Sequence, residues 1–429
     1  MRTVCIRNVR AVDAVRDLQC DILLENGKIA QLGQDLAVTA DVEIDGSGLT
    51  AMPGLFDMHV HFRDPGQTHK EDLETGTAAA LAGGITGVLC MPNTTPPMDT
   101  AETVGEFLSR AADCGIHVYQ TGCLTEKMQG KALADYTALQ AAGITALSDD
   151  GRPVADTALM EQAMIRAAAM GIPVVSHCED LEIIDGGIIH KGEISEQLGV
   201  KGMDRASEDN ITAREIALAK KNGVPIHICH VSTEGSVAII RTAKAEGVQV
   251  TCETAPHYFM LTHEKLLARD ADYRMNPPLR TEADRRAIIA GVLDGTIDCI
   301  ITDHAPHAPE EKADFERAPN GIVGLETSLA ATLTALYHTG LVSLQQIVAM
   351  MHHHPRRILG LPVYDLTVGA PADLILVDTE KEWVVEPDAF HSRSRNTAFK
   401  GMTLKGKNRL TIVDGEIRYG DEGFAHLTR

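Results

Sequence analysis

The segment FDMHVHFRDPG, residues 56–66, is an apolar run that ends in two histidines and a turn. The run is typical of a buried strand, and a spacing of two residues places the His59 and His61 side chains on the same side of it. Paired imidazoles at a strand end indicate metal ligands, but taken alone the pair is equally consistent with surface histidines. The residues at the ends of the other predicted strands help to decide between a metal site and surface histidines.

Further short β-branched runs end in polar residues and alternate with Ala- and Leu-rich helical stretches. The predicted strands are Phe56–His61, Gly87–Met91, His117–Gly122, Thr145–Ser148, Pro173–His177, Pro225–His230, Gln249–Glu253 and Asp298–Thr302. The helix candidates include Glu71–Leu81, Thr157–Ala169, Ala206–Lys221, Ser236–Glu246 and Glu282–Leu293. Eight such βα units predict an α/β fold, a (β/α)8 TIM-like barrel over residues 53–359. The competing layout, a doubly wound open sheet, lacks the G-x-G-x-x-G motif expected after its first strand.

The two ends of the chain differ from the middle. Residues 1–52 and 360–429 contain short alternating strands joined by Asn-Gly or Asp-Gly turns. Strand edges need partners, and neither segment supplies them alone. We therefore expect both termini to form one small β-sandwich domain beside a catalytic barrel.

Composition and charge exclude several classes of protein. The 429 residues carry 39 Lys and Arg against 60 Asp and Glu, a formal charge of −21, which argues against a nucleic-acid partner. The sequence has no apolar run long enough to span a membrane and no recognisable secretion signal. Its nine cysteines are scattered and form no C-x-x-C motif, which fits reduced thiols. We therefore expect a cytoplasmic protein with no membrane or nucleic-acid partner.

Other residues of metal-ligand type end further predicted strands. His177 ends the fifth strand, His230 the sixth, and Asp303 follows the eighth. These are the C-terminal strand ends, where barrel enzymes assemble their sites. Asp150 follows the fourth strand, although an Asp-Asp-Gly sequence is by itself also a common turn. Imidazole and carboxylate ligands suit Zn²⁺ or a similar cation, and a carboxylate can bridge two ions.

Seven motifs occur in a fixed order: FDMHVHFRDPG, MPNT, SDDG, SHCED, CHVST, NPPLR and TDHAPH. With these motifs the chain resembles dihydroorotases of the amidohydrolase superfamily over nearly its whole length. The resemblance implies a metal-dependent barrel with a small β-sandwich. It also implies reversible cyclisation of N-carbamoyl-L-aspartate to L-dihydroorotate, the third step of pyrimidine (UMP) synthesis.

The resemblance also implies individual roles. The metal ligands would be His59, His61, Asp150, His177, His230 and Asp303. Substrate contacts would come from His61, Arg63, Asn93, Asn276 and His307 and from the backbone of Gly321 and Ile322. We expect one or two Zn²⁺ ions, with two bridged by Asp150 as the favoured arrangement. A small-molecule substrate is implied, and we further expect a homodimer, with aspartate transcarbamoylase as a candidate protein partner.

The chemistry of the substrate agrees with these roles. A carboxylate and a cyclic imide require a fixed cation, amide partners and a Lewis acid. Arg63 stays on the face of His61, although an arginine before an Asp-Pro-Gly turn is also common on surfaces. Asn93 and Asn276 lie in loops where asparagine is often only a turn residue. We expect metal-activated hydroxide to attack the ring amide and Asp303 to carry the proton to the leaving nitrogen.

The chain departs from the family pattern at two places. Many relatives bridge their metals with a carboxylated lysine on the fourth strand, but no lysine lies between Lys131 and Lys191. The bridge is therefore expected to be an aspartate. Residues 319–322 are Pro-Asn-Gly-Ile, where the family pattern is Pro-Phe-Gly-Ile. Asn320 in place of phenylalanine removes an apolar surface beside the substrate ring.

Two alternative functions remain open. A hydantoinase or dihydropyrimidinase opens similar rings that lack the carboxylate, and Arg63 and the missing lysine count against it. A non-catalytic homologue that scaffolds aspartate transcarbamoylase should have lost metal ligands, and all six are present. We interpret His352-His353-His354 as structural, and Cys178 and Cys229 as packing residues that face away from the ligands.

Overall fold

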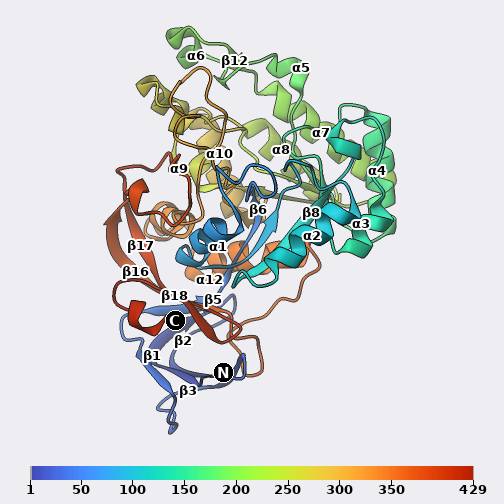
Figure 1. Cartoon of the computed structure of the whole chain (residues 1–429). Helices are drawn as coiled ribbons and strands as arrows, with labels where there is room; N and C mark the ends of the chain where they lie inside the picture. The colour runs from blue at the N-terminus through green and yellow to red at the C-terminus, as the bar shows by residue number, and fades with distance from the viewer. Residues whose placement is uncertain (1, 429) are drawn as a thin grey trace.

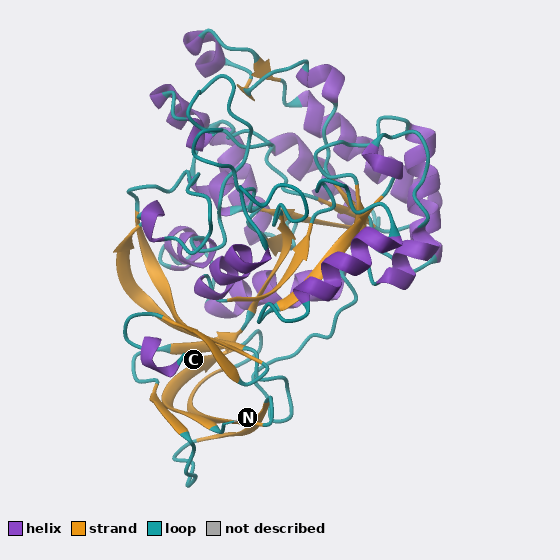
Figure 2. Ribbon diagram, viewed as in Figure 1, coloured by secondary structure: helices purple, strands orange, loops and turns teal. Residues whose placement is uncertain are grey.

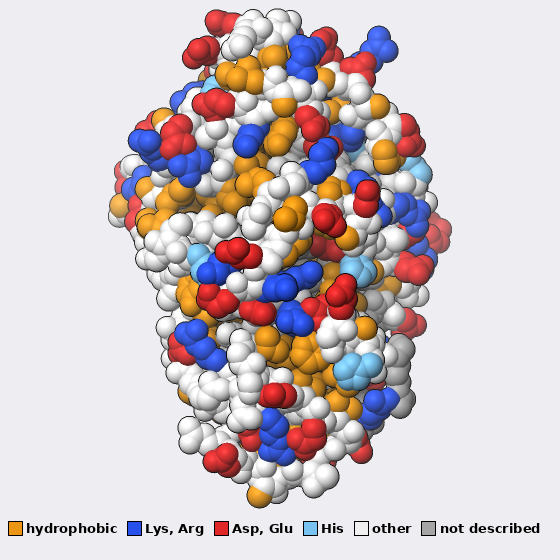
Figure 3. All heavy atoms as spheres, turned by 90° about the vertical axis from the view of Figure 1, so that its left-hand side faces the viewer, with side chains coloured by type: hydrophobic (Ala, Val, Ile, Leu, Met, Phe, Trp, Pro, Cys, Tyr) orange, Lys and Arg blue, Asp and Glu red, His pale blue; other side chains and the backbone are white. Residues whose placement is uncertain are grey.

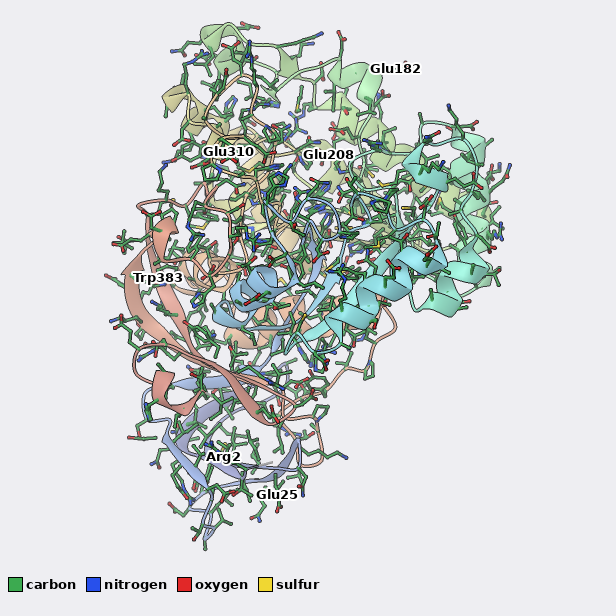
Figure 4. The ribbon with its side chains drawn as sticks, in the orientation of Figure 1. Arg2, Glu25, Glu182, Glu208, Glu310 and Trp383 are labelled. Atoms are coloured by element: carbon green, nitrogen blue, oxygen red, sulfur yellow. The ribbon has the colours of Figure 1, made fainter. Side chains whose placement is uncertain are left out.

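A computed structural model describes residues 2–428 as a barrel that sits on a smaller β-sheet (Figure 1). The barrel occupies the middle of the chain, and both termini lie in the sheet below it. In Figure 4, Arg2 and Glu25 mark the sheet, and Glu208 and Glu310 mark the opposite part of the molecule. The N-terminal and C-terminal segments therefore combine, as the turn patterns predicted.

Eight parallel strands form the barrel in chain order. They are β6 (Leu55–Val60), β7 (Ile85–Cys90), β8 (His117–Cys123), β9 (Ala146–Ser148), β10 (Val175–Ser176), β13 (Ile226–Ile228), β14 (Val250–Thr254) and β15 (Cys299–Ile300). Bridges between Leu147 and Val174 and between Val60 and His304 join the two four-stranded halves. The predicted barrel is thus confirmed. Several strands are shorter than predicted because their polar ends leave the ladder.

Buried hydrogen bonds tie the first barrel strand to the segment after the last. The Asp57 carboxylate accepts from the Thr302 hydroxyl at 2.6 Å and from the His59 backbone N–H at 3.1 Å. The His61 backbone N–H donates to the His304 carbonyl at 2.8 Å. Closure of the barrel therefore places the His59–His61 pair beside the Asp303 segment.

Helices surround the barrel strands (Figure 2). Helices α4 (Thr157–Ala169) and α10 (Glu282–Leu293) have the predicted bounds, because Asp156 and Thr281 cap their first turns. The others are α1 (Leu73–Ala82), α2 (Ala101–Ala111), α3 (Tyr136–Ala142), α5 (Leu181–Ile184), α6 (Glu193–Leu198), α7 (Ala206–Asn222), α8 (Glu234–Ala245), α9 (Pro256–Met260), α11 (Ser328–Thr332), α12 (Leu344–Val348) and α13 (His354–Ile358). Among residues 2–428, none of the helices combines the length and apolar character that crossing a bilayer requires.

The second sheet is built from both ends of the chain, in the order β18-β17-β16-β5-β1-β2-β3 with β4 paired to β1. Its strands are β1 (Val4–Val12), β2 (Asp17–Glu25), β3 (Lys28–Gly33), β4 (Val42–Asp45), β5 (Thr50–Pro53), β16 (Leu374–Val384), β17 (Thr403–Val413) and β18 (Glu416–Gly420). A separate two-stranded ladder joins β11 (Ile189–His190) and β12 (Gly202–Met203). Ile6, Ile22 and Leu374 are fully buried in a core distinct from that of the barrel. The domain limits at residues 52 and 360 stay a prediction.

The hairpin of β16 and β17 rises from this sheet along the side of the barrel, where Figure 4 labels Trp383. The Trp383 indole N–H donates to the Gly406 carbonyl at 2.9 Å across the hairpin. The Thr411 hydroxyl donates to the Leu81 carbonyl at 2.7 Å and so fixes β17 to α1. On this side of the molecule, acidic and basic side chains lie close together (Figure 3), as in the Lys405–Glu380 ion pair at 2.7 Å.

The three consecutive histidines lie in the helical segment that leads out of the barrel. The His352 ring lies between the carbonyl oxygens of Gly54 and Tyr364, at 2.7 and 2.9 Å. His353 Nε2 lies 2.8 Å from an Asp365 carboxylate oxygen. These contacts join the barrel to the chain that returns to the sheet.

Candidate metal centre and substrate cavity

All six residues predicted as metal ligands meet at the C-terminal end of the barrel strands. They are His59 and His61 from β6, Asp150 after β9, His177 after β10, His230 after β13 and Asp303 after β15. Each is at most 5% exposed. Residues separated by up to 244 positions in the sequence thus form one buried polar cluster.

Asp150 lies at the centre of the cluster. Ligand atoms group into two triads that share it: His59, His61 and Asp150, and Asp150, His177 and His230. Asp150 Oδ1 lies 3.5 Å from His59 Nε2 and 3.4 Å from His177 Nδ1, and Oδ2 lies 3.5 Å from His61 Nε2. Asp303 lies beside the first triad, with Oδ1 3.1 Å from His61 Nε2. This arrangement is compatible with a carboxylate between two ions.

Acceptors outside the cluster orient three of the histidines. Glu253 Oε1 lies 2.7 Å from His59 Nδ1, and Asn93 Oδ1 lies 2.8 Å from His61 Nδ1. When these Nδ1–H groups donate outward, the Nε2 lone pairs turn toward Asp150. Glu179 acts in the same way on His177, because its Oε2 lies 3.0 Å from Nε2 and leaves Nδ1 facing Asp150.

The cluster fits a divalent metal. His59 Nε2 and Asp150 Oδ1 are buried and have no hydrogen-bond partner within residues 2–428. Buried polar atoms without partners are costly, and a cation between them would satisfy both. Imidazole nitrogens and carboxylate oxygens are ligands that Zn²⁺ and similar ions accept.

Electrostatics keep the central carboxylate ionised. Burial alone would raise the pKa of Asp150, but His59 and the neighbouring imidazoles hold it well below its ordinary value. The pKa of Glu253 is likewise lowered, to about 2, because His59 and His227 outweigh its burial. The cluster therefore presents anionic ligands at neutral pH.

The backbone is strained at three positions around the cluster. Arg63, His230 and Asp303 have φ of 59°, 33° and 50°, a region that residues other than glycine rarely adopt. At His230 the strained backbone ends strand alternation, so Cys229 also faces the site, with Sγ within 4.8 Å of ligand atoms of His59 and Glu253. The expectation that Cys229 faces away from the ligands is therefore wrong.

A cavity of about 230 Å³ opens beside the cluster. Its walls include most of the predicted site: His61, Arg63, Asn93, Asp150, His177, His230, Asn276, Asp303, His307 and Gly321. His59 lies behind these residues, and Ile322 is fully buried and does not line the cavity.

Arg63 brings an unpaired positive charge to the cavity. Its side chain is buried, its Nε donates to the Pro306 carbonyl at 3.2 Å, and no carboxylate among residues 2–428 forms an ion pair with it. Burial lowers the pKa of Arg63 to about 10, so the guanidinium remains charged at neutral pH. A buried cation without a counter-ion favours an anionic ligand.

His307 lies next to Arg63 in the cavity wall. Its Nε2 is 2.9 Å from the Asn320 carbonyl and donates to it. Burial and the charges of Arg63 and Lys70 lower the pKa of His307 to about 2. The ring is therefore neutral, and its remaining Nδ1 is an acceptor.

The loop after residue 318 forms another wall. Asn320, the residue that departs from the family pattern, accepts a hydrogen bond from Arg274 at 3.1 Å through its side chain. Gly321 has φ of 156°, and a Cβ there would lie 2.5 Å from the Ala305 carbonyl oxygen. Only glycine fits this position.

Glu253 and Glu179 were not among the residues predicted for the site. Glu253 ends the seventh predicted strand, so an acid at the last buried position of a barrel strand was a usable signal. Glu179 follows His177 by two residues, on the same side of the chain as a ligand. Their function depends on which imidazole nitrogen they contact, and sequence does not reveal that.

Comparisons with known proteins show the family of the chain. The family described as Dihydro-orotase-like matches residues 48–236. A dihydroorotase of Citrifermentans bemidjiense is 46% identical over 419 residues, covering 96% of this chain and 99% of that protein. A dihydroorotase of Pelobacter propionicus is 47% identical with the same coverage. This chain belongs to the dihydroorotase family.

Solved structures of related amidohydrolases share the fold. An L-hydantoinase (dihydropyrimidinase) from Arthrobacter aurescens superimposes with a TM-score of 0.87 at 27% identity, covering 98% of this chain and 96% of that one. A dihydropyrimidinase from Brevibacillus agri gives a TM-score of 0.87 at 24% identity, with 98% and 95% covered. Within this shared architecture, the residues of the cavity must distinguish a dihydroorotase from a hydantoinase.

The contact between Glu253 and His59 predicts a role in metal binding. Glu253→Gln should weaken metal affinity about 10- to 100-fold, because the carboxylate orients the His59 ring and increases its basicity. Competition with a chromophoric chelator measures this affinity. Glu246→Gln, which changes an exposed carboxylate paired with Lys220, is the matched control. Equal affinities in both variants would contradict the assignment.

Proposed function

We propose that this protein interconverts N-carbamoyl-L-aspartate and L-dihydroorotate in pyrimidine synthesis. The observation that carries the proposal is the Arg63 guanidinium, buried without a carboxylate partner at the edge of a metal-ligand cluster. Dihydroorotate carries a carboxylate on a ring whose amide bond must be opened, so it matches both features. The dihydroorotase relatives support the same reaction.

The cavity residues would bind the substrate from several sides. Arg63 would form a charge-assisted hydrogen bond to the carboxylate. Asn93 and Asn276 would bond the polar ring edge. His307 would form the wall beside the carboxylate, with its Nδ1 turned toward Lys70 at 3.5 Å. The loop that carries Gly321 and Ile322 would close the remaining side.

The residues that would hold Zn²⁺ are His59, His61, Asp150, His177, His230 and Asp303, and Asp150, shared by both triads, is the group that could serve two ions. The metal would supply Lewis acidity toward the ring amide and toward water. Asp303 would accept the proton of the attacking water and return it to the leaving ring nitrogen. Burial opposes its ionisation, but the neighbouring His61 holds the pKa of Asp303 below its ordinary value, so it can act as a base. In the reverse direction Asp303 removes the proton from the ureido nitrogen.

The hydantoinase fold makes ring opening without a carboxylate the second candidate. Arg63 argues against it, because its buried guanidinium has no carboxylate of residues 2–428 within ion-pair distance and a neutral ring would supply none. The absence of lysine between Lys131 and Lys191 also separates this chain from relatives with a carboxylated lysine. The homodimer, the aspartate transcarbamoylase partner and the cytoplasmic location remain predictions.

The purified protein should hydrolyse L-dihydroorotate and form it from N-carbamoyl-L-aspartate. Ring closure consumes one proton, so the equilibrium should shift toward dihydroorotate by about tenfold for each pH unit lowered. Absorbance and chromatographic assays of both directions between pH 6 and 9 measure this. Turnover of dihydrouracil or hydantoin without turnover of dihydroorotate would refute the proposal.

Arg63→Met should raise KM for dihydroorotate roughly 10- to 150-fold, since a charge-assisted hydrogen bond contributes about 1.5–3 kcal/mol. Steady-state kinetics measure the change, and Arg152→Met, which alters an exposed arginine, provides the control. If KM is unchanged, another group binds the carboxylate.

Asp303→Asn should retain part of the metal and lose about 10²- to 10⁴-fold in kcat, the range for one positioned acid–base group. Metal analysis and kinetics on the same preparation separate the two effects. A metal-replete variant with the parent kcat would show that a different residue moves the proton.

A further inference from the structure

The chain between β16 and β17 reaches the mouth of the barrel. The Arg393 backbone N–H donates to Glu71 Oε1 at 3.0 Å, and the Ser392 hydroxyl also donates to this buried carboxylate. Glu71 Oε2 lies 3.2 Å from His304 Nε2, next to the candidate ligand Asp303. A segment from the terminal part of the chain is therefore fixed against the site.

Asn396 in this segment joins the two stretches of backbone that border the cavity. Its Nδ2 donates to the Ala305 carbonyl at 3.1 Å and to the Gly321 carbonyl at 3.0 Å. Its Oδ1 accepts from the His307 backbone N–H at 3.1 Å. Its own carbonyl accepts from the Val323 N–H at 2.9 Å. Asn396, which is 3% exposed, thus uses both the nitrogen and the oxygen of its side-chain amide to join the two stretches.

The stretches that Asn396 joins carry different parts of the site. The first includes Asp303 and His307, and the second includes Asn320 and Gly321, all four in the cavity wall. Their direct contacts include the bridge between His304 and Ile322 and the hydrogen bond from His307 Nε2 to the Asn320 carbonyl at 2.9 Å. The Gly321 carbonyl receives a second donor, Lys312 Nζ, at 3.3 Å. The spacing of the two walls therefore depends strongly on side chains.

We propose that Asn396 is a positioning residue for the substrate. It sets the distance between the His307 stretch and the Gly321 stretch without touching the substrate, since it does not line the cavity. The inference rests on the proposed dihydroorotase function. It means that the segment between β16 and β17 contributes to substrate binding. A small shift of one stretch relative to the other would weaken substrate affinity, because the contacts from both stretches must reach the substrate at the same time.

The chain offers a matched control for a merely structural role. Asn408 is also buried, lies in β17 and donates through Nδ2 to the carbonyls of Leu81 and Ala82, at 3.1 and 3.2 Å. It ties the hairpin to α1 and has no contact with the cavity wall. Loss of either amide removes three hydrogen bonds, two of them to backbone carbonyls, so both variants should lower stability by similar amounts.

The test compares Asn396→Ala with Asn408→Ala in the metal-loaded protein. Urea unfolding, metal content, kcat and KM for dihydroorotate are measured on each. We expect similar unfolding midpoints and unchanged metal content in both. KM should rise about tenfold in Asn396→Ala only, a loss of about 1.4 kcal/mol of binding, with kcat changed less than KM. Asn396→Ser, which keeps a short donor, should recover part of the KM.

An unchanged KM in Asn396→Ala, or an equal rise in Asn408→Ala, would overturn the inference. If Asn396→Ala does not fold, Asn396→Ser decides, and a parent KM in that folded variant also overturns it. Failure of the proposed function is a separate result, because it would appear as absence of dihydroorotate turnover in the unsubstituted protein.

Discussion

The burial of four histidines and one further aspartate around the Asp150 carboxylate is the constraint on which the site depends. Asp150 lies 3.4–3.5 Å from the rings of His59, His61 and His177, and each of these groups is at most 5% exposed. Such a cluster is expensive in a protein interior unless each polar atom has a partner. The two atoms without one, His59 Nε2 and Asp150 Oδ1, face each other, which is why the donor set fits a cation.

The rest of the barrel holds these residues in position. The hydrogen bonds from Thr302 to Asp57 and from the His61 N–H to the His304 carbonyl close the barrel where His59 and His61 of β6 meet Asp303. Glu253 and Glu179 contact the ring nitrogens of His59 and His177 that face away from Asp150, and so fix the orientation of these two rings. The carboxylates that orient ligands are therefore as much a part of the centre as the ligands themselves.

Sequence predicted the barrel and the meeting of the candidate ligands at one end of it, because each depends on local patterns. The bounds of α4 and α10 follow from their caps, and the ligands follow from polar residues at strand ends. Other features depend on contacts between distant segments or on backbone angles. The role of Asn396 depends on a return of the chain over the barrel, and the inward turn of Cys229 follows from the positive φ of His230. No periodic pattern signals either one.

The likeness to hydantoinases shows how little of the chemistry the fold specifies. The barrel is shared at a TM-score of 0.87, whereas Arg63 and the aspartate at the bridge position belong to the cavity of this chain. In the proposed function, the choice of substrate would depend on the Arg63 guanidinium and on the loops of the cavity wall, which side chains outside the barrel strands hold in place.

In the function that we propose, Asp150 would lie between two metal ions and no carboxylated lysine would be needed. A carboxylate with a lowered pKa is ionised without any added reagent, whereas lysine carboxylation requires carbon dioxide. The most direct test strips the metal, reconstitutes the protein with Zn²⁺ in carbon-dioxide-depleted buffer and in bicarbonate, and measures metal per subunit, with Asp150→Ala alongside. The account predicts equal loading of two ions in both buffers and loss of loading in Asp150→Ala, because two cations repel without an anion between them. A bicarbonate requirement, or two ions bound to Asp150→Ala, would contradict it.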